Sequence, residues 1–390
     1  MRRLDLRDLG FDAGAHVLLK RALTSVAVGG AIEVTGTAPE LSVHLRGWCR
    51  SHGHRVEWSG SVARVTRGDA DLGRWRGSEM AGEPNIVRER ASQTWGLAAR
   101  GATVEAGAPS FEFQLNERTE LWAEEAERIY ARAAAAQWDP ATAIDWDAKF
   151  ELPHAVERAV VQLMTYLIEN ETAALVIPAR YVAQIHPHFR EVMQVLAIQA
   201  ADEARHIEVF TRRALLKNSR LGLSTVSGQS SLKTLIDETD FALSSFLLSV
   251  MGEGTFLTLL KFLHRHAPDP VTRQVARLAG QDEARHVAFG MAHLSRHASE
   301  DAMLRERLAE GLERRAAALA NTAGLNEEVF DALVLIAAGG WEPEVIRSGW
   351  RAVQELEREM ANGRQRRLQR LGFDRDEAKR LSHLHTKNFM

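Results

Sequence analysis

The residues best suited to chemistry lie in a five-residue sequence that occurs twice. Asp-Glu-Ala-Arg-His occupies residues 202–206 and again residues 282–286. In each copy a Glu and a His stand three positions apart, so on a helix both project from one face and can reach the same metal ion. A single such pair means little in a chain with fifteen His residues, and Glu151 with His154 is a chance match. The full repeat indicates a metal site.

Two further carboxylates complete the predicted set of ligands. Glu171 is the one charge on an apolar helical stripe before the first copy, whereas Glu169 shares a stripe with polar residues and is the weaker candidate. Glu253 interrupts an apolar stripe before the second copy and lies between Gly252 and Gly254. Each Gly weakens a helix by about 1 kcal/mol, so this pair indicates close packing or room for a ligand. The predicted ligands are Glu171, Glu203, His206, Glu253, Glu283 and His286.

This set of ligands favours two ions of iron or manganese. Two divalent cations balance the four carboxylates, and buried charge of this kind is tolerated only when it is paired. Oxygen-rich ligation with one imidazole per ion suits iron or manganese, whereas zinc and copper sites contain more nitrogen or sulfur. We therefore predict a dinuclear non-haem iron centre, with a Mn/Fe pair as the alternative.

The composition excludes several other functions. With 49 Lys and Arg against 52 Asp and Glu, the net charge of −3 provides no basic field for nucleic acid or an anionic membrane. The single cysteine, Cys49, cannot form an intrachain disulfide or a four-cysteine metal site. No apolar run approaches the ~18 to 20 residues of a membrane span, and no signal peptide is evident. We expect a cytoplasmic protein that binds neither nucleic acid nor membrane.

The elements that must position the ligands fall into two kinds. Up to about residue 70, short β-branched runs alternate with helix-like stretches and Gly turns, which is typical of a small α/β unit. Residues 71–110 are rich in Gly, Arg and Ser and are predicted to be a linker. Residues 111–300 are predicted to form a helix bundle and residues 301–390 a C-terminal helical extension.

Turn signals divide the helical part into long segments. The predicted helices cover residues 113–137, 153–183, 189–217, 230–266, 268–298, 301–321, 326–338 and 342–371. Four of them are long for an ordinary globular domain and typical of a bundle. We predict an α+β multidomain chain in which an antiparallel four-helix bundle with extra helices follows a small two-layer α/β domain.

The order Glu, Glu-x-x-His, Glu, Glu-x-x-His over residues 111–300 resembles that of the ferritin-like carboxylate-bridged di-iron proteins. These include acyl-carrier-protein desaturases, ribonucleotide reductase small subunits, bacterial multicomponent monooxygenases and rubrerythrins. The resemblance implies a ferritin-like bundle and a reduced metal pair that activates O2. It also implies that Asp282 orients His206 and that Asp202 orients His286 by hydrogen bonds. A simpler role for each Asp is an ion pair with the Arg three positions on.

Differences from individual members of this superfamily narrow the predicted function. Radical-bearing reductase subunits have a Tyr four residues after the first ligand His, where this chain has Phe210. Rubrerythrins need a cysteine-ligated iron that one cysteine cannot provide. Arylamine N-oxygenases have a further His one turn before the last Glu-x-x-His, where this chain has Ala279. We predict a monooxygenase or oxidase that acts on a small organic substrate with O2 as co-substrate.

One alternative function and the source of electrons stay open. A ferroxidase or peroxide-handling protein uses the same ligands without an organic substrate, although such proteins are typically minimal bundles and this chain has 390 residues. No dinucleotide motif, P-loop or cysteine cluster occurs. An external donor, a ferredoxin or a flavin reductase, is therefore expected unless the substrate supplies the electrons. His293 is expected to be solvated or hydrogen-bonded rather than part of the cavity.

The N-terminal unit resembles the TusA-like sulfur-carrier fold over about residues 1–70. The resemblance rests on Leu4 to Arg7, Phe11 to Gly14, Leu18 to Leu23 and Gly30 to Val34. That family begins its first helix with Cys-Pro-x-Pro and carries a persulfide on the cysteine. Here Phe11, Asp12 and Gly14 stand at those positions, so thiol chemistry is not expected. Docking, homodimerisation or covering the bundle are the roles left open.

Overall fold

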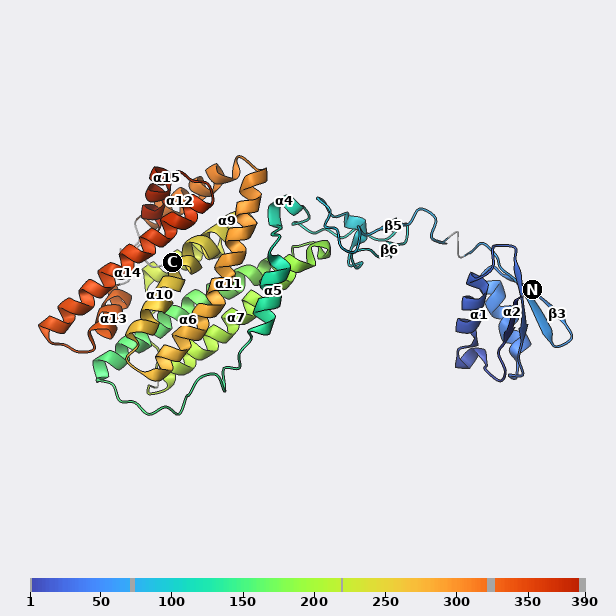
Figure 1. Cartoon of the computed structure of the whole chain (residues 1–390), viewed down its shortest axis with the longest axis horizontal. Coiled ribbons are helices and arrows are strands. Elements are labelled where there is room, and N and C mark those ends of the chain that lie inside the picture. The colour runs from blue at the N-terminus through green and yellow to red at the C-terminus, as the bar shows by residue number, and fades with distance from the viewer. Residues whose placement is uncertain (1, 71–73, 219, 321–326, 386–390) are drawn as a thin grey trace. The chain divides into compact units, whose positions relative to one another are not determined.

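The computed structural model describes residues 2–70, 74–218, 220–320 and 327–385. The chain divides into two compact units, Met1–Asn85 with Thr94–Phe111 and Ile86–Gln93 with Glu112–Met390. The first unit contains a small sheet and the second is built of helices (Figure 1). This confirms the predicted fold class. The finer boundaries at residues 70, 110 and 300 stay predictions.

The first unit contains a four-stranded sheet covered on one face by two helices. Its elements are β1 (Arg2–Asp5), α1 (Ala15–Thr24), β2 (Ala31–Thr35), α2 (Leu41–Ser51), β3 (Arg55–Ser59) and β4 (Val62–Thr66). The strand order is β1-β2-β4-β3, with β1 and β2 parallel and the other pairs antiparallel. Ile32 pairs with Val65 and Val34 with Ala63, and all four are fully buried. Alternation along the strands therefore builds one apolar face.

The backbone before α1 does not accommodate a Cys-Pro-x-Pro motif. Gly14 has a φ of 101°, whereas the proline ring fixes φ near −65°. Cys49 on α2 is fully buried, and burial raises the pKa of its thiol to about 12, so it is a neutral core side chain. The TusA-like resemblance itself stays a prediction. A two-stranded antiparallel sheet of β5 (Glu79–Met80) and β6 (Thr103–Val104) lies in the segment predicted to be a linker.

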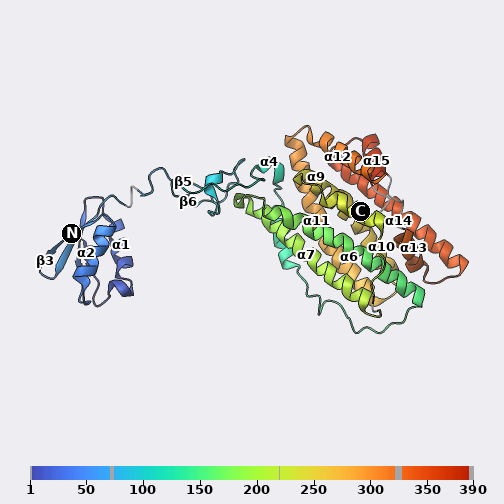
Figure 2. The same cartoon turned by 180° about the vertical axis from the view of Figure 1, so that it is seen from behind.

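The second unit is a helix bundle with additional helices packed on it. Its helices are α4 (Arg118–Leu121), α5 (Ala126–Ala135), α6 (His154–Val182), α7 (Arg190–Leu215), α8 (Val226–Ile236), α9 (Phe241–Ser245), a π-helical segment (Phe246–Glu253), α10 (Gly254–His266), α11 (Pro270–Glu300), α12 (Leu304–Leu319), α13 (Glu327–Ala338), α14 (Pro343–Arg370) and α15 (Arg375–Leu384). Helices α6, α7, α10 and α11 lie side by side, with α13 packed on α6 and α14 on α10 (Figure 2). This arrangement confirms the predicted ferritin-like bundle.

Two predicted helices differ from the structure. Residues 113–137 form only the short helices α4 and α5 rather than one helix. Residues 230–266 do not form one helix, because Asp240 Oδ1 accepts a hydrogen bond from the backbone N–H of Leu243 at 2.7 Å and begins a new helix as its N-cap. The helix then passes through the π-helical segment before α10. Helix α15 was not predicted.

A buried ion-pair network fixes one end of the bundle. Arg213 of α7 is fully buried and donates to both oxygens of Glu157 on α6, at 2.9 and 3.0 Å. It also donates to Asp269 at 2.7 Å. Asp269 is the N-cap of α11 and accepts from the backbone N–H of Thr272 at 2.8 Å. Three helices are therefore held in a fixed relation by one guanidinium group.

Two helical stretches of the bundle are long and apolar enough to cross a membrane by length and composition. They are His154–Val182 and Phe241–His266, with mean hydropathy of 1.2 and 1.5. The expectation that no segment is this apolar is wrong for both. Inside the protein, 72% and 83% of their apolar windows are buried, and each carries a buried acid, Glu171 or Glu253. Their hydropathy is that of core helices in the bundle.

Candidate metal centre

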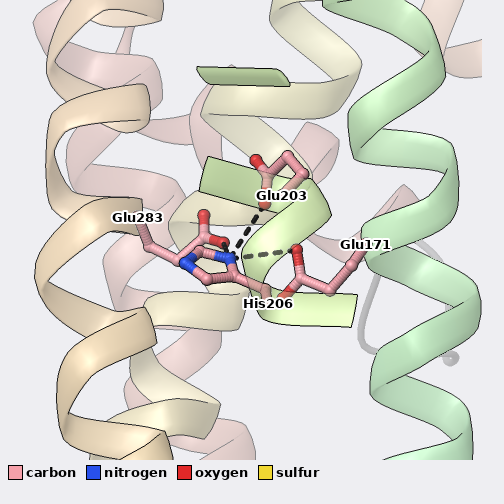
Figure 3. Close-up of side chains that lie close together, drawn as sticks. All are labelled: Glu171, Glu203, His206 and Glu283. Atoms are coloured by element: carbon pink, nitrogen blue, oxygen red, sulfur yellow. Dashed lines mark hydrogen bonds and ion pairs between the residues drawn. The ribbon is translucent and has the colours of Figure 1, made fainter. Parts of the chain in front are cut away.

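Four elements of the bundle direct acidic and imidazole side chains to one buried region. Helix α6 supplies Glu171, α7 supplies Glu203 and His206, the π-helical segment supplies Glu253, and α11 supplies Glu283 and His286. None of the six is more than 3% exposed. Figure 3 shows four of them pointing toward one another from α6, α7 and α11. The structure thus brings together every residue of the predicted ligand set.

The six residues form two groups that overlap. The first group is Glu171, Glu203, His206 and Glu283, and the second is Glu203, Glu253, Glu283 and His286. Within each group, one ligand atom from every residue lies within 4.8 Å of the others. Glu203 and Glu283 belong to both groups. Each group contains one further carboxylate and one imidazole that the other group lacks.

Both imidazole rings face the carboxylates with the same nitrogen. His206 Nδ1 lies 3.0 Å from Glu203 Oε2 and 3.5 Å from Glu171 Oε2. His286 Nδ1 lies 3.0 Å from Glu203 Oε1. The two oxygens of Glu203 therefore face one His each.

The other ring nitrogen of each His contacts the Asp of the opposite copy. His206 Nε2 lies 3.2 Å from Asp282 Oδ2, and His286 Nε2 lies 3.2 Å from Asp202 Oδ2. Each Asp also forms an ion pair with the Arg three positions on, Arg205 or Arg285. Each Asp therefore makes both of the predicted contacts, the one to the His of the other copy and the ion pair with the Arg of its own copy. Once the ring is neutral, a carboxylate that accepts from Nε2–H would leave Nδ1 as the nitrogen that can bind metal.

Two residues near these Asp side chains were not singled out from the sequence. Gln137 Nε2 donates to Asp202 Oδ1 and Trp138 Nε1 donates to Asp282 Oδ2, both at 2.8 Å. They follow α5, which packs against α7 and α11. No local sequence signal places the end of α5 beside both motifs, so only the tertiary structure could reveal these contacts.

A third supporting residue could have been found from helical spacing. Gln199 Nε2 donates to Glu253 Oε1 at 2.8 Å, and Gln199 is only 2% exposed. It lies four positions before Glu203 and hence on the same face of α7. Its amide group fixes the orientation of the Glu253 carboxylate.

Burial and mutual repulsion disfavour a full set of charges at this site. Burial, followed by the charges of Glu203 and Glu283, raises the pKa values of Glu171 and Glu253 well above the ordinary value. Burial alone would also raise the pKa of Glu203, but His286 and His206 hold it below the ordinary value. Burial opposes charging of both imidazoles, yet the surrounding carboxylates raise their pKa values. Cations would therefore displace protons on binding.

Several of the buried oxygens have no hydrogen bond to any described residue. They include Glu171 Oε1, Glu253 Oε2 and both oxygens of Glu283. Buried polar atoms in proteins are nearly always hydrogen-bonded, so convergent carboxylate oxygens without partners indicate a cation. Together with the two Nδ1 atoms, they fit a pair of first-row transition-metal ions.

The glycines near the ligands serve close packing rather than an open cavity. A Cβ atom at Gly254 would lie 2.4 Å from Arg367 Cζ, and one at Gly290 would lie 2.5 Å from Ser249 Cβ. Real Cβ atoms do not approach so closely. The lack of a side chain at Gly254 therefore leaves room for Arg367. The lack of a side chain at Gly290 lets the π-helical segment pack closely against α11.

The prediction that His293 is solvated or hydrogen-bonded is wrong. His293 is fully buried, and neither ring nitrogen has a hydrogen-bond partner in the described part of the chain. Its ring stacks on Phe289 and contacts Phe241. Burial lowers its pKa to about 3, so the ring is neutral.

Comparison with known proteins yields structural similarity only. No family model and no curated protein matches this sequence. The chain is similar to an R2-like ligand-binding oxidase from Sulfolobus acidocaldarius, with 17% identity, a TM-score of 0.44, and coverage of 65% of this chain and 93% of that chain. A variant of an R2-like ligand-binding oxidase with an anaerobically reconstituted Mn/Fe cofactor is 17% identical, with a TM-score of 0.45 and coverage of 67% and 94%. Function must be inferred from the site itself.

Proposed function

We propose that this chain is a dinuclear non-haem metal oxidase that uses O2. The observation that carries the proposal is the pair of overlapping ligand groups that share Glu203 and Glu283. In this proposal Glu203 and Glu283 would contribute to both metal sites, Glu171 and His206 would complete one of them, and Glu253 and His286 would complete the other. Iron is the first choice for both ions and a Mn/Fe pair the alternative, because carboxylate oxygens outnumber imidazole nitrogens.

The protein contributes position and a water-excluding environment. When bound, a redox-active metal pair supplies electrons for O2 activation. Asp282 and Asp202 hold the imidazole rings with Nδ1 toward the ions, and Gln199 holds the carboxylate of Glu253. Phe210 is fully buried with its ring centroid 6.2 Å from that of His206, so this side of the site is closed to water.

We further propose a small organic substrate and an external electron donor. The four helices α12 to α15 exceed what iron handling alone requires, which favours an enzyme over a storage protein. Oxygen insertion by a monooxygenase needs two electrons beyond those of the substrate. Because the sequence contains no nucleotide or cysteine-cluster motif for an electron carrier, a ferredoxin or flavin reductase is the proposed partner.

Metal loading tests the proposed site. Full-length protein is loaded anaerobically with Fe(II), or with Fe(II) and Mn(II), and the bound metal is counted. We expect about two ions per chain, and fewer in Glu203→Ala and His286→Ala. Glu151→Ala and His154→Ala are matched controls, because this Glu-x-x-His pair is exposed. Unchanged metal content on replacing Glu203 or His286 would contradict the proposal.

Addition of O2 separates the oxidase from the ferroxidase. A transient optical absorption whose decay rate responds to an added organic compound supports the oxidase. Slow mineral growth during repeated Fe(II) additions, with no response to any organic compound, would assign the chain to iron handling. Both outcomes presuppose a loaded site, so they are informative only after the metal count.

A further inference from the structure

A group of basic side chains lies next to the π-helical segment. Arg364 and Arg367 project from α14, and His385 follows α15. Arg367 Nε donates to the backbone carbonyl of Val250 in the π-helical segment at 2.6 Å. Arg364 donates to the hydroxyl groups of Thr255, at 3.4 Å, and Ser382, at 3.3 Å. The group therefore joins α10, α14 and α15 beside the element that carries Glu253.

These basic side chains act on one another electrostatically. Burial, followed by the charges of Arg364, Arg315 and Arg367, lowers the pKa of His385 well below its ordinary value. Burial also lowers the pKa of Arg364 and of Arg367 to about 10, and Arg364 contributes to the shift at Arg367. Arg315 of α12 is 5% exposed and donates to Thr234 Oγ1 at 2.9 Å. Positive charge is thus concentrated in a region where Arg364 and Arg367 are partly buried and Arg315 is buried.

No carboxylate pairs with Arg364 or Arg367 in the part of the chain that the structure describes. The partners of Arg364 and Arg367 are hydroxyl groups and a carbonyl oxygen, and none is a carboxylate. His385 is 4% exposed and neither ring nitrogen has a hydrogen bond to a described residue. Arg367 Nη2 is buried and likewise without a partner. Partly buried guanidinium groups without a carboxylate partner, beside buried donors that are not hydrogen-bonded, mark a place for an anion.

We propose that Arg364, Arg367 and His385 bind the oxyanion group, a carboxylate or a phosphate, of a small molecule. The guanidinium fork matches the geometry of both anions, and the neutral imidazole offers one further N–H donor. Gly254 permits this arrangement, because a Cβ there would lie 2.4 Å from Arg367 Cζ. Arg367 would then contact both the anion and Val250, three residues before Glu253. The proposal does not depend on bound metal.

Calorimetric titration of the full-length protein with acetate and with inorganic phosphate tests the proposal. We expect saturable binding of at least one of the two at about one anion per chain, with the preferred probe distinguishing a carboxylate from a phosphate. Arg364→Gln and Arg367→Gln should each weaken binding about tenfold or more. Arg366→Gln is the matched control, because Arg366 lies on the same helix but is exposed, and should bind as the unmodified protein does.

Several outcomes would overturn the proposal. The first is the absence of saturable binding, and the second is equal affinity of the Arg366→Gln and Arg367→Gln variants for the anion. The third is loss of binding when a chelator removes metal, because the anion would then be held at the metal centre. The titration is repeated on chelated protein. It therefore tests the anion site even if the metal-loading experiment contradicts the proposed metal centre.

Melting temperatures show whether Arg367→Gln loses anion binding because the variant is misfolded. If Arg367 is a cation without a carboxylate partner, the variant should melt no lower than the unmodified protein in anion-free buffer, and phosphate or acetate should raise only the melting temperature of the unmodified protein. If Arg367 acts only as a hydrogen-bond donor to Val250, the variant should melt lower and the anion should shift both proteins equally. The second result would overturn the proposal.

Discussion

At the scale of residues, two aspartates connect the two copies of the repeated motif. Asp282 accepts from Trp138 Nε1, lies 3.2 Å from His206 Nε2 and pairs with both Arg205 and Arg285. Its neighbour in the sequence, Glu283, faces the interior of the site. One short stretch of α11 thus supplies a predicted ligand for both ions and the group that orients the imidazole of the other copy.

Replacing Asp282 by Asn tests whether this orientation matters for metal binding. The amide cannot match the carboxylate as an acceptor for His206 Nε2–H, so the ring is held less firmly with Nδ1 toward the metal. We expect metal affinity about 10 to 100 times lower, measured by competition with a chelator of known affinity. Asp331→Asn is the control, since Asp331 is exposed. A lower melting temperature with unchanged metal affinity would contradict the orienting role of Asp282 and leave it only the role of an ion-pair partner.

At the scale of elements, the distance between α11 and the π-helical segment is set by one glycine. Gly290 lies one turn beyond His286 and faces Ser249, whose Cβ would be 2.5 Å from an added methyl group. Ser249 Cβ is next to the backbone and cannot swing away. A larger residue at position 290 must therefore separate the element that carries Glu253 from the helix that carries His286.

Gly290→Ala is predicted to destabilise the protein and to impair the second metal site. Overpacking of this kind costs about 1 to 3 kcal/mol, measured by denaturant unfolding, and metal content should fall toward one ion per chain. Gly280→Ala on the same helix is the control, because its Cβ would meet Leu260 Cβ at 3.7 Å, an ordinary contact. It should be neutral or stabilising by up to about 1 kcal/mol. Equal effects of the two variants would rule out this account.

At the scale of the whole molecule, the bundle is predicted to depend on metal and the first unit is not. Four buried carboxylates without cations repel one another, whereas the core of the first unit consists of apolar residues and Cys49. Metal that binds only the folded bundle, at 100 times its dissociation constant, stabilises it by about 2.7 kcal/mol. Chelation should therefore lower the melting temperature of the bundle and leave that of the first unit unchanged. Scanning calorimetry measures both.

A matched variant identifies the site responsible for this stabilisation. Glu203→Gln removes a charge that belongs to both ligand groups, so the melting temperature of the bundle should respond less to metal and to chelator than in the unmodified protein. Exposed Glu151→Gln should respond as the unmodified protein does. If added metal stabilises both variants equally, the ions bind elsewhere.

The sequence by itself determined the six proposed ligands and the bundle that carries them. Helical spacing is a local property, so Glu203 with His206 and Glu283 with His286 could be assigned to one face each without knowledge of the fold. Glu171 and Glu253 were found for a similar reason, because a lone charge on an apolar stripe must be buried with its helix. The interruption before Asp240 and the π-helical segment did not obscure this pattern.

Only the tertiary structure decided how these residues are shared and supported. That Glu203 and Glu283 lie in both ligand groups, and that Gln137 and Trp138 contact the aspartates, depends on contacts between segments far apart in the chain. The same holds for His293, which the fold buries without a partner, and for Arg364, Arg367 and His385. Helical periodicity indicates which face of a helix is buried, but the identity of the neighbour on that face is set by packing between helices.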